Sequence, residues 1–267
     1  MNRKLEGMVE AFKNDKDKYD FFDLNCWWDV SNNKTFHGID NFDQLKNEIK
    51  AHQIKKAVIT NAECLKYDPF TGNETTAALI KGSGNLFGAM VLAPEIVCNG
   101  GIKKYIDDKI EQSFVAARMF PKKLNHSMKK WLIGDILGYL DYKKLPLILW
   151  HNEVGWDLIE ELCQEYKNLP VIVEGNDVKL LYHNRNYITL LKKYPNFYLE
   201  THNLIIYSEI DHLAGEISDE NLIFGTYFPY NTPDASMMPI TAASIDEASK
   251  HKIAGQNLQR LIDNIKR

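Results

Sequence analysis

The chain has 267 residues, of which 45% are hydrophobic and 25% are charged, and its formal net charge is −4. This length suits one β/α barrel of about 250 residues, so we expect a single domain over residues 1–267. Charges of both signs are interspersed without a basic patch, which argues against nucleic acid and anionic membranes as partners. No stretch approaches the roughly 20 apolar residues of a membrane span.

The cysteines and the N-terminal segment predict a cytoplasmic protein. No zinc-type spacing joins the four cysteines, which are typical of reduced thiols in the cytosol. They are Cys26, Cys64, Cys98 and Cys163. The first 20 residues are charged and lack the apolar core of a signal peptide.

Hydrophobic periodicity predicts a short N-terminal helix over residues 3–15 and then strands that alternate with helices. The predicted strands are 21–30, 56–61, 86–92, 114–120, 145–150, 169–174, 196–202 and 222–225. The helices that we expect between and after them are 42–52, 73–81, 102–110, 131–140, 156–166, 187–194, 235–243 and 246–265. A polar loop, residues 176–186, is expected over the barrel mouth, where such loops often act as lids.

This alternation demands a parallel sheet with helical crossovers, and eight such units favour closure into a barrel. The predicted fold class is therefore α/β, a single (β/α)8 TIM barrel with a short N-terminal helix and C-terminal helices. An open doubly wound sheet is the main alternative. The glycine-rich motifs of nucleotide-binding folds are absent from the sequence, so nucleotide binding by those routes loses its support.

Several segments resemble, in order, motifs of one barrel family. Residues 67–74 read YDPFTGNE and resemble a "DPxxGN" phrase, and residues 145–150 read LPLILW and resemble "LPVxxH". Residues 222–229, LIFGTYFP, resemble "LLFGSDxP", and residues 253–261, IAGQNLQRL, resemble "IxGxNAxRL". Along nearly its whole length the chain resembles the amidohydrolase superfamily of metal-dependent-hydrolase-like TIM barrels.

The departures from this family fall on its metal ligands. The first strand of the family carries Asp-x-His-x-His, and this chain has Asn25 and Trp27 at the two histidine positions. Trp150 and Gly175 replace two further histidines, and Tyr227 replaces an aspartate. Indole and glycine cannot coordinate a divalent metal. We therefore expect no cofactor, with a divalent metal such as zinc as the alternative.

A replacement metal site made of His151, Glu153, Glu174 and His202 has the right residue types. The strand phases of residues 151 and 174 disagree with inward pointing, however, which argues against this set.

The residues expected at the strand ends define two candidate roles. The substrate-binding candidates are Arg118, Asn25, Trp27, Trp150 and Tyr227. The catalytic candidates are His202 or His151 as the general base, with Glu200 as its orienter, because Glu200 and His202 lie two apart and share a face. In the competing interpretation, Arg118 and Glu200 form a buried ion pair that braces the barrel.

Together with the resemblance, these residues imply a hydrolase or lyase, independent of metal, that acts on a small acidic organic substrate. A non-catalytic protein that binds a small molecule on the same barrel is the alternative, and a conventional metallohydrolase is a third. Whether the chain is an enzyme stays open at this stage. Family barrels also associate through their outer helices, so a homo-oligomer is compatible with the sequence.

Overall fold

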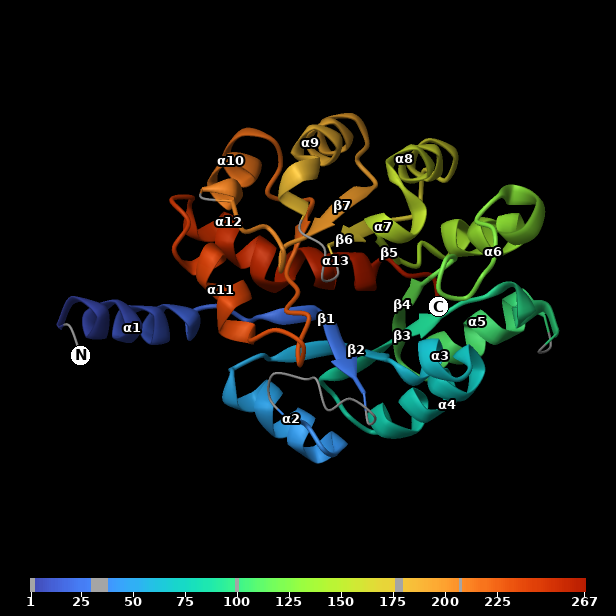
Figure 1. Cartoon of the computed structure of the whole chain (residues 1–267), viewed down its shortest axis with the longest axis horizontal. Helices are drawn as coiled ribbons and strands as arrows, with labels where there is room; N and C mark the ends of the chain where they lie inside the picture. Colours follow the sequence, from blue (N-terminus) through green and yellow to red (C-terminus); the bar gives the residue numbers. More distant parts are fainter. Residues whose placement is uncertain (1–2, 30–37, 99–100, 176–179, 207) are drawn as a thin grey trace.

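A computed structural model describes residues 3–29, 38–98, 101–175, 180–206 and 208–267. In this part of the chain, eight parallel strands lie in sequence order, each hydrogen-bonded to the next, inside a ring of helices (Figure 1). The predicted (β/α)8 TIM barrel is therefore confirmed. The strands are β1 (Phe22–Trp28), β2 (Lys56–Asn61), β3 (Leu86–Val91), β4 (Phe114–Arg118), β5 (Leu147–Trp150), β6 (Val171–Glu174), β7 (Phe197–Glu200) and β8 (Leu222–Ile223).

Backbone hydrogen bonds join the first strand to the segment that follows the last one. The amide of Leu24 donates to the carbonyl of Phe224 at 3.0 Å, and the amide of Trp27 donates to the carbonyl of Phe228 at 2.7 Å. These bonds bring the two edges of the sheet together, so the barrel has no long open edge on the described chain.

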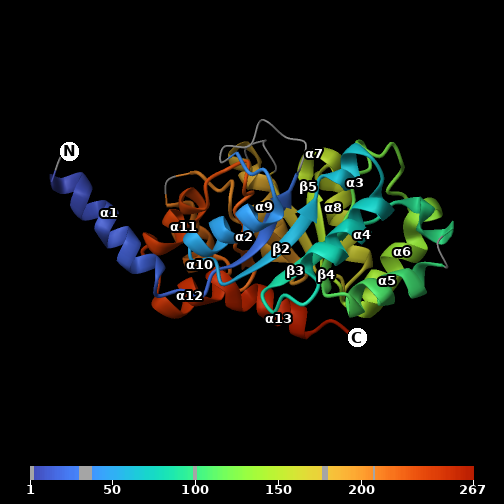
Figure 2. The ribbon, with the colours of Figure 1, turned by 90° about the horizontal axis from the view of Figure 1, so that it is seen from below.

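The helices surround the barrel and close its amino-terminal end. Figure 2 places α13 and the C-terminus at its lower edge, on the side away from the viewer in Figure 1. The helical elements between β1 and β5 are α2 (Phe42–Ala51), α3 (Glu63–Lys66), α4 (Pro69–Ile80), η1 (Pro94–Cys98), α5 (Ile102–Glu111) and α6 (Lys130–Lys143). Those after β5 are α7 (His151–Val154), α8 (Trp156–Glu165), η2 (Leu180–His183), α9 (Asn184–Lys193), α10 (Glu209–Glu216), α11 (Pro233–Thr241), α12 (Glu247–His251), η3 (Lys252–Gln256) and α13 (Asn257–Asp263).

The N-terminal helix α1 (Arg3–Lys16) extends away from the barrel in both views (Figures 1 and 2). Its end is tied to α11 by an ion pair in which the Lys16 ammonium lies 3.1 Å from the Asp234 carboxylate. Among the described residues, none of the helices combines the length and the apolarity that crossing a membrane needs.

The strands are buried on both faces, which explains their nearly continuous apolar sequences. All four residues of β5, Leu147–Trp150, are buried, as expected for a parallel strand that is covered by helices outside and by side chains inside. The sequence offers Asp40 or Asn41 as the N-cap of α2, and the structure has Asn41, because its side chain accepts a hydrogen bond from the Gln44 amide at 2.9 Å.

Several element boundaries differ from the predictions. Helix α4 starts four residues earlier than expected, because the Asp68 side chain accepts from the Thr71 amide at 2.7 Å and Pro69 fits the first turn. Helix α10 was not predicted at all. The expected loop at 176–186 is shorter, because η2 and α9 begin at Leu180 and Asn184; residues 176–179 lie outside the described residues.

Candidate active site at the carboxyl ends of the strands

A buried polar cluster joins three strands at their carboxyl ends. Arg118 ends β4, Glu174 ends β6 and Asn25 lies in β1, and each side chain is fully buried. The Arg118 guanidinium donates to the Glu174 carboxylate through Nη1 and to the side-chain Oδ1 of Asn25 through Nη2, the latter at 3.0 Å. The sequence alternative that paired Arg118 with Glu200 is therefore wrong, because the partner of Arg118 is Glu174.

Glu174 points into the barrel, contrary to the strand phase expected from sequence. In the parallel pairing of β5 with β6, Trp150 lies opposite Glu174, so both side chains stand on the same face of the sheet. The Trp150 indole N–H donates to Glu174, and Asn25 Nδ2 donates to the other carboxylate oxygen. The carboxylate thus sits beside the first-strand asparagine rather than among the outer helices.

Glu200 and His202 form the second part of the cluster. Glu200 ends β7, and its carboxylate contacts Nδ1 of His202 and accepts from the His202 amide at 2.7 Å. Asn25 Nδ2 also donates to Glu200 at 3.3 Å, which links both halves of the cluster. The His202 ring stacks on Tyr227, with centroids 5.2 Å apart and planes at 24°. The structure therefore brings six of the eight predicted site residues together in this cluster, namely Arg118, Asn25, Trp150, Tyr227, Glu200 and His202. The other two are Trp27 and His151.

Burial away from solvent shifts the pKa values of two carboxyl groups, those of Glu174 and Asp23. Burial raises the pKa of Glu174 above its ordinary value; the Arg118 charge opposes this shift, and the Glu200 charge adds to it. Beneath the cluster, burial also raises the pKa of Asp23 to about 7, against the hydrogen bonds that it accepts from Thr226 and Asn25. Asp23 was not recognised from the sequence as part of this region.

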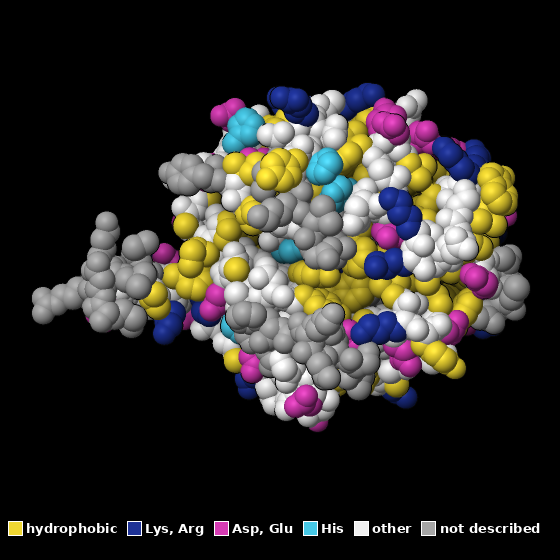
Figure 3. Space-filling view, viewed as in Figure 1, with side chains coloured by type: hydrophobic (Ala, Val, Ile, Leu, Met, Phe, Trp, Pro, Cys, Tyr) yellow, Lys and Arg dark blue, Asp and Glu magenta, His cyan; other side chains and the backbone are white. Residues whose placement is uncertain are grey.

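An aromatic wall, defined as Trp27, Phe120, Trp150, Tyr227 and Tyr230, covers the cluster. The Trp27 ring lies 5.6 Å from Trp150 and 6.1 Å from Phe120 between centroids, and the Arg118 guanidinium lies 5.1 Å from the Trp27 ring centre. The Trp27 indole N–H donates to Asn25 at 2.9 Å. Figure 3 looks onto this end of the barrel and shows a hollow lined by hydrophobic side chains.

Gly225 permits the close approach of β8 to this cluster. A methyl group on Gly225 would lie 2.3 Å from Oε1 of Glu200 and 2.9 Å from Cβ of Asn25. Only the absence of a side chain leaves room for both, so this glycine supports the site although it carries no reactive group.

His151, the other predicted base, lies in a different environment. Strand β5 ends at Trp150, and His151 starts α7, where its ring stacks on Trp156 with centroids 5.7 Å apart. The His183 ring lies 4.8 Å away, and burial lowers the pKa of His151. Its neighbours are thus side chains of α8 and η2, and the cluster around Arg118 contains His202 instead.

Three residues of the cluster could hold a metal ion. One ligand atom each from Glu174, Glu200 and His202 can be chosen so that all lie within 4.8 Å of one another. Two carboxylates and an imidazole are ligands of zinc and of manganese. This triad contradicts the expectation of a chain without a cofactor, which was drawn from the lost family positions and from the wrong strand phase of Glu174.

The sequence and the fold were compared with known proteins. No protein-family model matches the chain, and no curated protein matches its sequence. Among solved structures, a 2,6-dihydroxybenzoate decarboxylase from Rhizobium has a TM-score of 0.66 and 15% identity, covering 92% of this chain and 99% of that one. A dihydroxybenzoic acid decarboxylase from Polaromonas sp. JS666, with bound manganese and an inhibitor, has a TM-score of 0.65 and 15% identity, covering 92% and 97%.

A structure named amidohydrolase II has a TM-score of 0.67 and 12% identity, covering 91% of this chain and 99% of that one. At 12–15% identity, these matches show that the chain shares its fold with the three proteins. The resemblance that the sequence motifs suggested is confirmed at the level of the fold.

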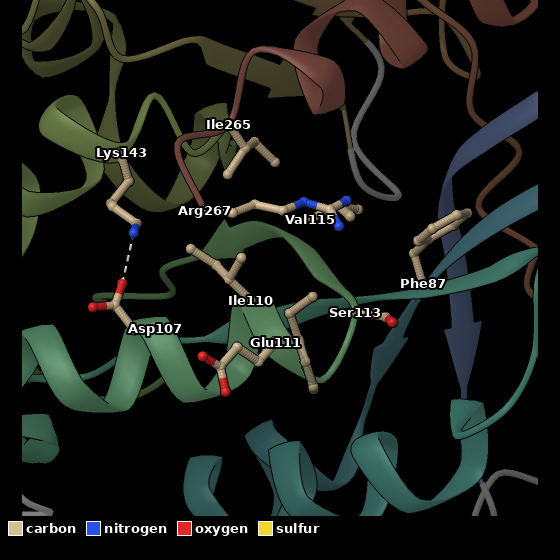
Figure 4. A pocket seen from close by; sticks show the side chains of 10 residues that line it. Phe87, Asp107, Ile110, Glu111, Ser113, Val115, Lys143, Ile265 and Arg267 are labelled. Atoms are coloured by element: carbon tan, nitrogen blue, oxygen red, sulfur yellow. Dashed lines mark ion pairs between the residues drawn. The ribbon is translucent and has the colours of Figure 1, made fainter.

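A separate cavity of about 410 Å³ lies at the opposite end of the barrel (Figure 4). Phe87, Phe114 and Val115, from the beginnings of β3 and β4, line it, and an ion pair between Lys143 and Asp107 at 2.8 Å borders it. In β/α barrels this end serves stability rather than chemistry, so the cavity does not mark the candidate site.

Proposed function

We propose that this chain is an enzyme, a hydrolase or lyase that acts on a small acidic organic substrate at the carboxyl ends of its strands. The observation that carries this proposal is the buried cluster of Arg118, Glu174, Glu200 and His202 under an aromatic wall. Barrels with the same fold support it, since one decarboxylase structure is complexed with 2,6-dihydroxybenzoate, a small aromatic acid. Fold alone does not fix function, so the argument depends on the site.

This sequence lacks the side chains that usually bind metal in the family. In this proposal, the triad of Glu174, Glu200 and His202 takes their place. Its donor atoms fit a divalent cation, because two carboxylates and one imidazole converge in a buried position. When bound there, such a cation would polarise a substrate oxygen or lower the pKa of a bound water.

The protein side chains have separate tasks in this site. Arg118 binds the acidic group of the substrate, because its Nε is buried and has no hydrogen-bond partner among the described residues. Glu200 orients the His202 imidazole, and stacking on Tyr227 fixes the ring plane. With the triad free of metal, His202 exchanges a proton with the substrate as general base or acid. With a cation bound, His202 is a ligand instead, and the cation-activated water or substrate oxygen carries the chemistry. Trp27 and Trp150 exclude water and face the apolar part of the substrate.

A non-catalytic protein that binds a small molecule is the second candidate. The observation that favours it is the depth of the cluster, because Trp27 and Trp150 are only 2% and 4% exposed and already donate their indole N–H groups to Asn25 and Glu174. A site whose polar groups are satisfied internally can serve as a brace for the barrel and leave only the aromatic wall for a ligand.

A screen of aromatic and aliphatic carboxylates, with and without Zn²⁺ or Mn²⁺, tests the two candidates. We expect turnover that His202→Asn abolishes and that His212→Asn, at a half-exposed histidine of α10, leaves unchanged. The variant His151→Asn decides between the two predicted bases. Turnover that persists in His202→Asn would refute the proposed site. Ligand-induced thermal stabilisation without turnover would support the binding protein instead.

A further inference from the structure

Glu174, one member of the metal triad, already forms an ion pair with the Arg118 guanidinium. Its Oε1 accepts from Nη1 of Arg118 and from the Trp150 indole, and its Oε2 accepts from Nδ2 of Asn25. Arg118, Glu174 and Glu200 are all 0% exposed. A metal ion at the Glu174 carboxylate therefore competes with three donors, which occupy most of its roughly four lone-pair positions.

The charges of Arg118, Glu174 and Glu200 make the competition between the guanidinium and a metal ion strong. With His202 neutral, the two carboxylates and the Arg118 guanidinium sum to one negative charge, and a dication would turn this into one positive charge. Buried like charges repel each other much more strongly than exposed ones, because the protein interior screens them poorly. The guanidinium thus opposes the dication both by holding Glu174 and by its own charge.

We propose that Arg118 is a built-in competitor that sets the affinity of the Glu174, Glu200 and His202 triad for a divalent cation. This inference rests on the metal site of the proposed function and assigns a second role to Arg118. The guanidinium keeps Glu174 charge-balanced when no metal is bound. It also holds the metal affinity below that of an uncontested set of two carboxylates and one imidazole.

Metal titration of the full-length chain tests this role. Wild type, Arg118→Met and Arg118→Lys are stripped with a chelator and titrated calorimetrically with ZnCl2 and MnCl2, and metal content is measured by elemental analysis. We expect Arg118→Met to bind one equivalent at least ~100-fold more tightly than wild type, because the repelling charge is gone. Arg118→Lys keeps the charge and should stay within ~10-fold of wild type.

Two results of the titration would overturn the proposal. One is an Arg118→Met variant whose metal affinity changes less than about threefold, which is well below what a lost buried charge should do. The other is an Arg118→Lys variant that tightens binding as much as Arg118→Met, since this would show that hydrogen bonding or size, and not charge, limits the site.

Thermal unfolding with and without metal is the control for correct folding of the variants. Arg118→Met leaves Glu174 uncompensated, so a cation should raise its melting temperature more than that of wild type, because the ligand binds only the folded state. An Arg118→Met chain that the cation fails to stabilise would also count against the proposal.

Adding Glu200→Gln to Arg118→Met should abolish the tight binding; if it does not, the metal lies outside the triad. Because no substrate is used, these results are independent of whether the chain catalyses a reaction.

Discussion

Replacement of Asp23 by asparagine should remove a pH dependence from the stability of the barrel. The Asp23 carboxylate is fully buried and accepts hydrogen bonds from the Thr226 hydroxyl at 2.6 Å, the Thr226 amide at 3.0 Å and the Asn25 amide at 2.8 Å. These bonds hold the charged form, but burial outweighs them and raises the pKa to about 7 from 3.8. Asparagine is nearly isosteric, keeps one acceptor oxygen and does not titrate.

The sign and size of the effect follow from linkage. Because the folded pKa lies above the unfolded one, the folded chain holds a proton between pH 4 and pH 7 that the unfolded chain has released. Stability therefore falls as pH rises through this window. The slope is about 1.4 kcal/mol per pH unit well below pH 7 and falls to half of this at the pKa, which amounts to about 2 kcal/mol between pH 5 and pH 7.

Urea unfolding of the chelator-treated protein at pH 5, 6, 7 and 8 measures this effect. We expect the difference in unfolding free energy between Asp23→Asn and wild type to grow in favour of the variant up to pH 7 and then to level off. Comparing the two proteins cancels groups that both share, including Glu174. Asp20→Asn, which removes an exposed carboxylate from the same segment, is the matched control and should follow wild type. Parallel pH profiles for Asp23→Asn and wild type would refute the reasoning.

Three further substitutions test the packing of the site. Glu174→Gln should lower the unfolding free energy by about 3–5 kcal/mol in chemical denaturation, because it leaves the buried Arg118 charge without a carboxylate; a loss below 1 kcal/mol would contradict the ion pair. Gly225→Ala should cost about 1–3 kcal/mol and weaken metal binding in the same calorimetric titration, because the new methyl group overlaps Glu200. Trp150→Phe keeps a ring but removes the indole donor to Glu174, so thermal and urea unfolding should show a loss of about 1–3 kcal/mol; an unchanged midpoint would exclude that bond as a stabilising contact.

The local sequence pattern was sufficient to predict the order of strands and helices. Short apolar runs such as Leu147–Trp150 alternate with amphipathic helices, and that alternation has few three-dimensional solutions. The helix caps were predicted less well. The cap of α2 was narrowed only to Asp40 or Asn41, and the start of α4 at Pro69 was missed because the capping role of Asp68 was not recognised. Helix α10 was missed as well.

The candidate site was predicted only in part. Position at a strand end was enough to select Arg118, Asn25, Glu200 and His202, which the fold does bring together. It was not enough to choose the partner of Arg118. The only signal for Glu174 was its place as the last residue of a predicted strand, and a wrong strand phase removed it from the site.

The sequence by itself determined the barrel, because its hydrophobic periodicity specifies the alternation of buried strands with covering helices. Only the tertiary structure decided which acidic side chains meet inside it. Inward or outward pointing depends on the register between neighbouring strands, and the pairing of Trp150 with Glu174 is a contact between residues 24 positions apart. A shift of one residue in that register would have turned Glu174 toward the helices and left Arg118 without its carboxylate.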